Sequence, residues 1–479
     1  MVATEQVILE STRTRRQEPI STATRHTVGW AAILALVVTG VTLNPASATE
    51  RTPDPTLPHL QYRLANGLEI ILHRDNSIPL VAVDLWYHVG ARNETPGHSG
   101  FAHLFEHMLF QGAEHIGEDV HFEILRKIGG TSVNGSTNFD RTNYYEVVPS
   151  HQLETALWLE SDRMGYFLPM LTDKSFRNQV DVVRNERRQN YDNQPYRSAL
   201  FPLFEALYPP DHPQRHLVIG LHEHLTSANV DDVRNFYKTW YVPANATLVL
   251  AGDFDLDQAR ALIDKWFGGF PKSVRPAGPV AKPAVLTRSI KLEHPDKFAK
   301  LRQLQMVWHA PAAYQEGEVE LEVAAHTLGA EGTGRLFKKL VITEKLAQNV
   351  SSKVWSMQDG SLFFVTVTLK SNADAAKVKQ FVQDELALIV KEPISERELD
   401  RARVDHESGF IWGLESLLAR AEALSRYNHY VGKPDYISDD LERFRRSNPI
   451  RVREVTARVL GQPNVELWIM PVGNKKAEP

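Results

Sequence analysis

Two parts of this sequence repeat the same pattern of elements at nearly the same separation, and that repeat limits the folds open to the chain. A strand-like alternation surrounds both Trp86 and Trp308, which are 222 positions apart in the 479 residues. Each alternation precedes a segment with helical periodicity. A helix followed by an apolar strand recurs around Leu248 and Leu467, which are 219 positions apart. The two separations indicate two copies of one α+β unit, although ordinary strand–helix units could also resemble each other by chance.

The stretch between the two copies is rich in proline. Residues 271–286 contain four of them: Pro271, Pro276, Pro279 and Pro283. Proline lacks a backbone N–H and disfavours helix interiors and central strands, so this density predicts an extended tether. We therefore expect an N-terminal domain at residues 49–272, a linker at 273–287 and a C-terminal domain at 288–479.

The first 48 residues have the pattern of an export signal. An uncharged apolar run covers residues 28–43, arginines precede it, and Ala46-Ser47-Ala48 offers a cleavage site between small residues. The run is shorter than the roughly 20 residues that a membrane-spanning helix needs. We therefore interpret residues 1–48 as a signal peptide, which would place the mature protein in the periplasm of a Gram-negative bacterium. An uncleaved N-terminal membrane anchor is the alternative.

The composition excludes several kinds of chemistry. The chain contains no cysteine, so disulfides, thiol nucleophiles and cysteine-based zinc sites are ruled out. Its net charge is −5 and its sequence pI is near 6.5, which gives no sign of the basic surface that nucleic-acid-binding proteins carry. Function has to be sought in individual motifs.

The sequence His-Leu-Phe-Glu-His at residues 103–107 is the strongest of these motifs. Apolar residues recur around it at helical spacing and predict a helix: Phe101, Leu104, Phe105 and Met108. His103 and His107 would then lie on one face, one turn apart, so both could reach one metal ion. Glu106 lies beside them and could take a proton from water bound to that metal. A helix whose histidines bind nothing is the alternative.

Glu186 is the best candidate for a third metal ligand. A hydrolytic zinc site usually has three protein ligands and one open position. Glu186 lies on the flank of a second predicted helix, for which Thr172 is the candidate N-cap. Because a glutamate on a helix is normally exposed to solvent, the residue pattern alone does not select it.

The 103–107 motif, followed at long range by Arg184-Asn185-Glu186, resembles the pitrilysin family of inverted-motif zinc peptidases, in particular its short bacterial processing-peptidase-like members. The similarity extends from about Leu57 to Pro471. It implies that His103, His107 and Glu186 bind one Zn²⁺ ion per chain and that Glu106 is the catalytic base. It also implies an α+β fold of two similar domains from an internal duplication. Each would be a mostly antiparallel sheet with helices packed on one face, and the two would be arranged as a clam.

The segment 129–137 is expected to bind substrate. Its glycines indicate a turn into a strand. In the pitrilysin family the matching strand is an exposed sheet edge that pairs with the peptide backbone. We therefore expect Asn134, Gly135 and Ser136 to contact substrate, with Asn134 holding or polarising a carbonyl. An Asn-Gly turn is the alternative.

The second half lacks the zinc motif and is expected to shape the chamber. Many relatives use an arginine and a tyrosine there. Arg302 is the candidate arginine, but His309 stands where the tyrosine would fall, and Arg420, Arg426 and Tyr427 are weaker candidates. A partner could supply the missing pair. We therefore expect a dimer, either a homodimer or a pair with a related subunit that lacks the zinc motif.

Motif and resemblance together predict a zinc-dependent endopeptidase that hydrolyses peptides or unfolded protein segments. The alternatives are a non-catalytic peptide-binding or scaffold subunit of a two-chain assembly, and a zinc-binding, membrane-anchored assembly factor. Other clusters of ligand-type residues are interpreted as loops: His222-Glu223-His224, His115 and His121.

Overall fold

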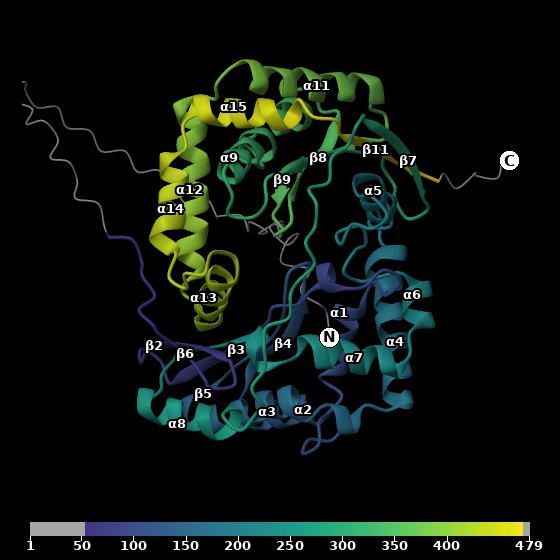
Figure 1. Cartoon of the computed structure of the whole chain (residues 1–479). Coiled ribbons are helices and arrows are strands. Elements are labelled where there is room, and N and C mark those ends of the chain that lie inside the picture. The colour runs from purple at the N-terminus through teal and green to yellow at the C-terminus, as the bar shows by residue number, and fades with distance from the viewer. Residues whose placement is uncertain (1–52, 473–479) are drawn as a thin grey trace, which may run out of the picture.

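The computed structural model describes residues 53–472, so the signal peptide predicted at residues 1–48 lies outside the described part. Within that part the chain forms two sheets with helices on their outer faces (Figure 1). No helix there is long and apolar enough to cross a membrane.

The first sheet has six strands in the order β1-β2-β6-β3-β5-β4. Their bounds are β1 (Leu60–Arg63), β2 (Glu69–Arg74), β3 (Leu80–Tyr87), β4 (Thr131–Thr137), β5 (Thr142–Pro149) and β6 (Ala246–Gly252). Only β2 and β6 are parallel neighbours, and the other pairs are antiparallel. Because β4 is last in this order, one of its sides is a free sheet edge.

The helices of the first half form the layer beneath this sheet and extend to one side of it (Figure 1). Their bounds are α1 (Phe101–Met108), α2 (Val120–Lys127), α3 (Leu153–Gly165), α4 (Asp173–Arg187), α5 (Leu200–Leu207), α6 (His222–Ser227), α7 (Val230–Trp240) and α8 (Leu256–Phe267). The predicted N-cap of α4 is confirmed, because the Thr172 hydroxyl accepts a hydrogen bond from the backbone N–H of Ser175. This cap fixes where the helix that carries Glu186 begins.

The second sheet repeats the first. Its order is β7-β11-β8-β10-β9, which matches the first sheet without β1, and its one parallel pair, β7 and β11, corresponds to β2 and β6. The strands are β7 (Ile290–Asp296), β8 (Gln303–Ala310), β9 (Ala347–Trp355), β10 (Ser361–Leu369) and β11 (Val465–Pro471). The helices are α9 (Glu318–Gly329), α10 (Arg335–Phe337), α11 (Ala375–Lys391), α12 (Glu396–Gly413), α13 (Leu417–Val431), α14 (Ile437–Arg446) and α15 (Pro449–Leu460). The predicted duplication and the α+β fold class are confirmed.

The two halves exchange one helix each. Helix α13 belongs to the second half but packs on the inner face of the first sheet, where Leu424 joins an apolar cluster with Ile71 and Val249 (Figure 1). Helix α5 of the first half packs in turn on β11 of the second sheet, where Leu203 and Leu467 share a core. Since α5 and α13 hold the same place in the two repeats, the exchange is reciprocal.

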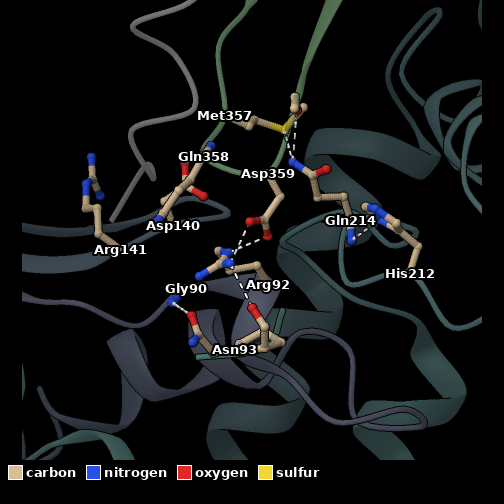
Figure 2. Close-up of polar contacts among 12 residues, drawn as sticks. Gly90, Arg92, Asn93, Asp140, Arg141, His212, Gln214, Met357, Gln358 and Asp359 are labelled. Carbon is tan, nitrogen blue, oxygen red and sulfur yellow. Dashed lines mark hydrogen bonds and ion pairs between the residues drawn. The ribbon is translucent and has the colours of Figure 1, made fainter. Parts of the chain in front are cut away.

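A polar cluster also joins the halves, as Figure 2 shows. Arg92 lies just before α1, and its guanidinium binds both carboxylate oxygens of Asp359, in the β9–β10 turn, at 2.6 and 2.7 Å. It also donates to the carbonyl of Pro279 at 3.1 Å. Residues 268–289, between α8 and β7, contain no helix or strand, and the linker predicted at residues 273–287 falls within them. The domain boundaries themselves stay predictions.

Candidate metal centre and active site

Helix α1 is short and entirely buried. It begins after Gly100, whose φ of 91° is in the left-handed region that glycine tolerates. The side-chain oxygens of Glu94 accept hydrogen bonds from the N–H groups of Gly100 and Ala102 at 3.1 and 2.9 Å, so this side chain caps the helix start. Burial raises the pKa of Glu94 to about 8. This cap was not predicted from the sequence, because Glu94 is six residues upstream of Gly100.

Three ligand-type side chains meet where α1 crosses α4. The Nε2 atoms of His103 and His107 lie 3.7 and 3.2 Å from one carboxylate oxygen of Glu186. The ligand atoms of the three residues all lie within 4.8 Å of one another. Two ligands of a tetrahedral zinc ion with bonds of about 2.1 Å are separated by about 3.4 Å. The separations therefore fit one zinc ion, with the two Nε2 atoms and the Glu186 carboxylate as donors.

The electrostatics of these groups suit a cation. Burial alone would lower the pKa of His107, but the hydrogen bond to Glu186 and the charge of Glu106 raise it above its ordinary value. Burial would raise the pKa of Glu186, but the hydrogen bond from His107 and the charge of His103 lower it. Asn190, in a π-helical turn that extends α4, donates to the other Glu186 oxygen at 3.2 Å. The Glu186 carboxylate thus favours a positive charge beside the imidazoles. A metal ion would take the place of the imidazole proton there, because histidine binds a metal in its neutral form.

Strand β4 lies beside Glu106 of α1 and holds its side chain in place. The Thr137 hydroxyl donates a hydrogen bond of 2.8 Å to a carboxylate oxygen of Glu106, which fixes the direction of that side chain. Two residues earlier, a Cβ on Gly135 would lie 2.9 Å from the Cγ atom of Glu106 and 3.2 Å from the Phe110 ring. Glycine at this position therefore allows α1 to approach the strand. Thr137 was not among the residues predicted from the sequence, although Gly135 and Thr137 share one face of a strand by the two-residue period.

The other substrate-binding candidates have different surroundings. Asn134 lies within β4 and pairs with Tyr145 of β5, so the Asn-Gly turn weighed as an alternative is wrong. Ser136 faces away from α1, and its hydroxyl donates to Asn143 at 2.7 Å. The structure does not bring Arg302 to the metal-ligand group: it precedes β8, and its guanidinium donates to the carbonyl of Ala373.

A second buried cluster lies behind the site, around Arg163. His121 was predicted to be a loop residue, but it is in α2 and only 4% exposed. Its Nε2 atom lies 2.7 Å from the Arg163 guanidinium, which is also 3.0 Å from Glu160. Burial raises the pKa values of both Glu146 and Glu160. Because the guanidinium already contacts His121 and Glu160, we interpret this cluster as structural.

The loop interpretation of residues 222–224 is also wrong, because they form the start of α6. The N-cap of the next helix, α7, is Asn229. His222 contacts Asp192 at 3.0 Å, and His224 contacts the Ser99 hydroxyl at 2.8 Å. These histidines tie α6 to the end of α4 and the start of α1.

Two family models match the chain. One, described as insulinase (peptidase family M16), matches residues 69–217 and so contains the 103–107 motif. The other, described as the peptidase M16 inactive domain, matches residues 227–404. The chain belongs to peptidase family M16. The first match contains the paired histidines, and the second extends from the last part of the first half into the second half.

Individual M16 relatives resemble the chain over most of its length. It is 28% identical over 385 residues to the zinc protease PqqE of Helicobacter pylori. The aligned region covers 79% of this chain and 86% of PqqE. The crystal structure of a protease from Helicobacter pylori superposes with a TM-score of 0.81 at 24% identity, over 87% of this chain and 100% of that chain. The periplasmic protease PqqL from Escherichia coli gives a TM-score of 0.72 at 18% identity, over 88% of this chain but 48% of that chain.

Proposed function

We propose that this M16 chain is a zinc-dependent endopeptidase acting on peptides or unfolded protein segments. The observation that carries the proposal is the convergence of His103, His107 and Glu186 within 4.8 Å, with Glu106 hydrogen-bonded to the neighbouring strand. The resemblance to proteins named zinc proteases supports zinc as the metal.

In this proposal, His103, His107 and Glu186 hold the ion. Zinc, when bound, supplies a Lewis acid that acidifies water and polarises a carbonyl. Glu106 accepts the proton of the attacking water and then delivers it to the amine that leaves. The Thr137 hydroxyl holds the Glu106 carboxylate in place during both transfers.

The free edge of β4 offers a place for the peptide backbone. Main-chain hydrogen bonds along an edge strand give affinity with little demand on side chains, which suits an enzyme that cleaves varied sequences. We propose that Asn134, Gly135 and Ser136 contact the peptide there, with the Asn134 side chain near a substrate carbonyl. Arg302 would need a different conformation to take part.

The rival function is that of a non-catalytic subunit in a two-chain assembly. The second half fits that description by itself, since α9 carries a single histidine, His326, which lies 3.6 Å from Asp405. The first half does not fit it, because its ligand set is complete. Since the chain corresponds in fold to about half of PqqL, we propose that it works as a dimer, either with itself or with a related subunit. The predicted signal peptide and the periplasmic PqqL relative both support export.

The experiment compares wild-type protein with Glu106→Gln for zinc content and for cleavage of an unstructured peptide with and without a chelator. We expect both proteins to bind one zinc ion and only the wild type to cleave. Glu331→Gln, at an exposed position on the second half, is the matched control and should behave as wild type. Cleavage by Glu106→Gln at the wild-type rate, or wild-type protein without zinc affinity, would contradict the proposal.

A further inference from the structure

A cavity of about 330 Å³ lies beyond the end of β4, between the first sheet and helices of the second half. Trp86 and Arg141 line it from the first half, and Arg426 and Tyr430 of α13 line it from the second. Asn138, which also lines it, directly follows β4. A peptide paired with the edge of β4 would therefore extend toward this cavity.

The spacing relates the cavity to the proposed catalytic base. Glu106 packs against Gly135, and Asn138 is three residues farther along the chain. At about 3.3 Å per residue, the two positions are about 10 Å apart. A peptide residue about three positions from the cleaved bond would reach the cavity.

The cavity contains two guanidinium groups without a carboxylate partner. Within residues 53–472 neither Arg141 nor Arg426 forms an ion pair, and the Nε atom of each is buried without a hydrogen-bond partner. Arg141 lies over the Trp86 ring at 5.0 Å and donates to the backbone carbonyl of Ser136 at 2.8 Å. Arg426 lies over the Tyr427 ring at 4.9 Å. Both cations therefore have donors left for an anion.

Neighbouring acids offset the charge of these arginines only in part. Glu318 and Asp440 are engaged by Arg443, at 2.7 and 2.8 Å. Burial raises the pKa of Glu322 to about 8, so it is mostly neutral at pH 7. Burial also raises the pKa of Glu422, which lines the cavity, although the charges of Arg141 and Arg426 lower it in part. The charged residues that line the cavity are two arginines and one glutamate, so an excess of positive charge remains there even when Glu422 is ionised.

We propose that this cavity is a subsite for a carboxylate group of the peptide substrate, bound by Arg426 and Arg141. A guanidinium offers a planar pair of N–H donors that matches a carboxylate, and the rings of Trp86, Phe410 and Tyr430 provide apolar walls. The carboxylate belongs either to an acidic side chain about three positions from the cleaved bond or to the C-terminus of a short peptide. The inference rests on the proposed function and adds a substrate class to it.

The test measures binding, so that it does not depend on turnover. Fluorescence anisotropy with full-length Glu106→Gln protein would compare four labelled, unstructured peptides that carry Glu or Gln at one position and a free or amidated C-terminus. We expect a carboxylate to strengthen binding about tenfold, as one charge-assisted contact does. A difference in affinity between the Glu and Gln peptides would show that the cavity binds a side-chain carboxylate. A difference between the free and amidated peptides would show that it binds the C-terminal carboxylate.

Variants then assign the effect. Arg426→Gln should abolish the preference, Arg426→Lys should keep part of it, and Arg446→Gln, an arginine with a 79% exposed side chain, should leave it unchanged. Equal affinity for all four peptides, or no binding of any of them, would overturn the subsite without any variant being made. Zinc-dependent cleavage by wild-type protein without a charge preference would leave the proposed function standing. A charge preference in binding, without cleavage by the wild type, would support the subsite and contradict the proposed function.

Discussion

At the residue scale, the direction of Glu106 is set by one hydrogen bond from a neighbouring strand. The Thr137 hydroxyl is buried and donates to one Glu106 oxygen, so the other oxygen is free to take a proton. A general base works only within hydrogen-bond reach of the proton that it removes. Thr137 is therefore a positioning residue, and its loss should affect the chemical step rather than metal binding.

Thr137→Val keeps the shape of the side chain and removes this donor. We expect kcat to fall about tenfold, which corresponds to one hydrogen bond to a charged group, with KM and zinc content nearly unchanged. Steady-state kinetics and metal analysis would check this. Thr131→Val, at the exposed start of the same strand, is the control. Loss of zinc from Thr137→Val would show instead that the threonine supports the ligands.

At the element scale, the site depends on how closely α1 lies against β4. Gly135→Ala would place a methyl group 2.9 Å from Glu106, so the helix or the strand must move. A displacement of about 1 Å costs about 100-fold in rate, and we expect a loss of that size in kcat/KM. The overpacking should also cost about 1–3 kcal/mol in the free energy of unfolding. Gly117→Ala, whose nearest neighbour would be 3.4 Å away, should change neither quantity. Wild-type activity in Gly135→Ala would show that the contact can relax.

Local patterns in the sequence were sufficient to predict most helices and strands, but not the contacts between them. The periodicity of α1 and the cap of α4 are local signals, and the structure has both. Glu186 could be chosen only through the family resemblance, because nothing within α4 shows that it faces His107. No local sequence pattern indicated the buried role of Arg163, since that role depends on contact partners such as His121 that are distant in sequence. The exchange of α5 and α13 is likewise invisible to local patterns.

At the scale of the whole molecule, the two halves are joined by exchanged helices and by the contact between Arg92 and Asp359. Both members of this pair are largely buried, with side chains 10% and 12% exposed. Removing one member of a buried pair leaves a charge without compensation, which costs more than an exposed pair contributes. We therefore expect this contact to stabilise the relative position of the two halves. Neither of its residues is one of the candidate metal ligands.

The double-mutant cycle of Arg92→Ala and Asp359→Ala tests this role. We expect each single change to lower the free energy of unfolding by about 3 kcal/mol, and the double change to cost clearly less than the sum, because the second removal relieves the unpaired charge. Denaturant unfolding gives these values. The exposed pair Arg446 and Glu442 is the control and should contribute less than about 1 kcal/mol. Zinc content should stay at one ion per chain in every variant. Additive losses in the cycle would mean that the two side chains stabilise the halves independently, through Pro279 and the β9–β10 turn, and that their ion pair does not couple the domains.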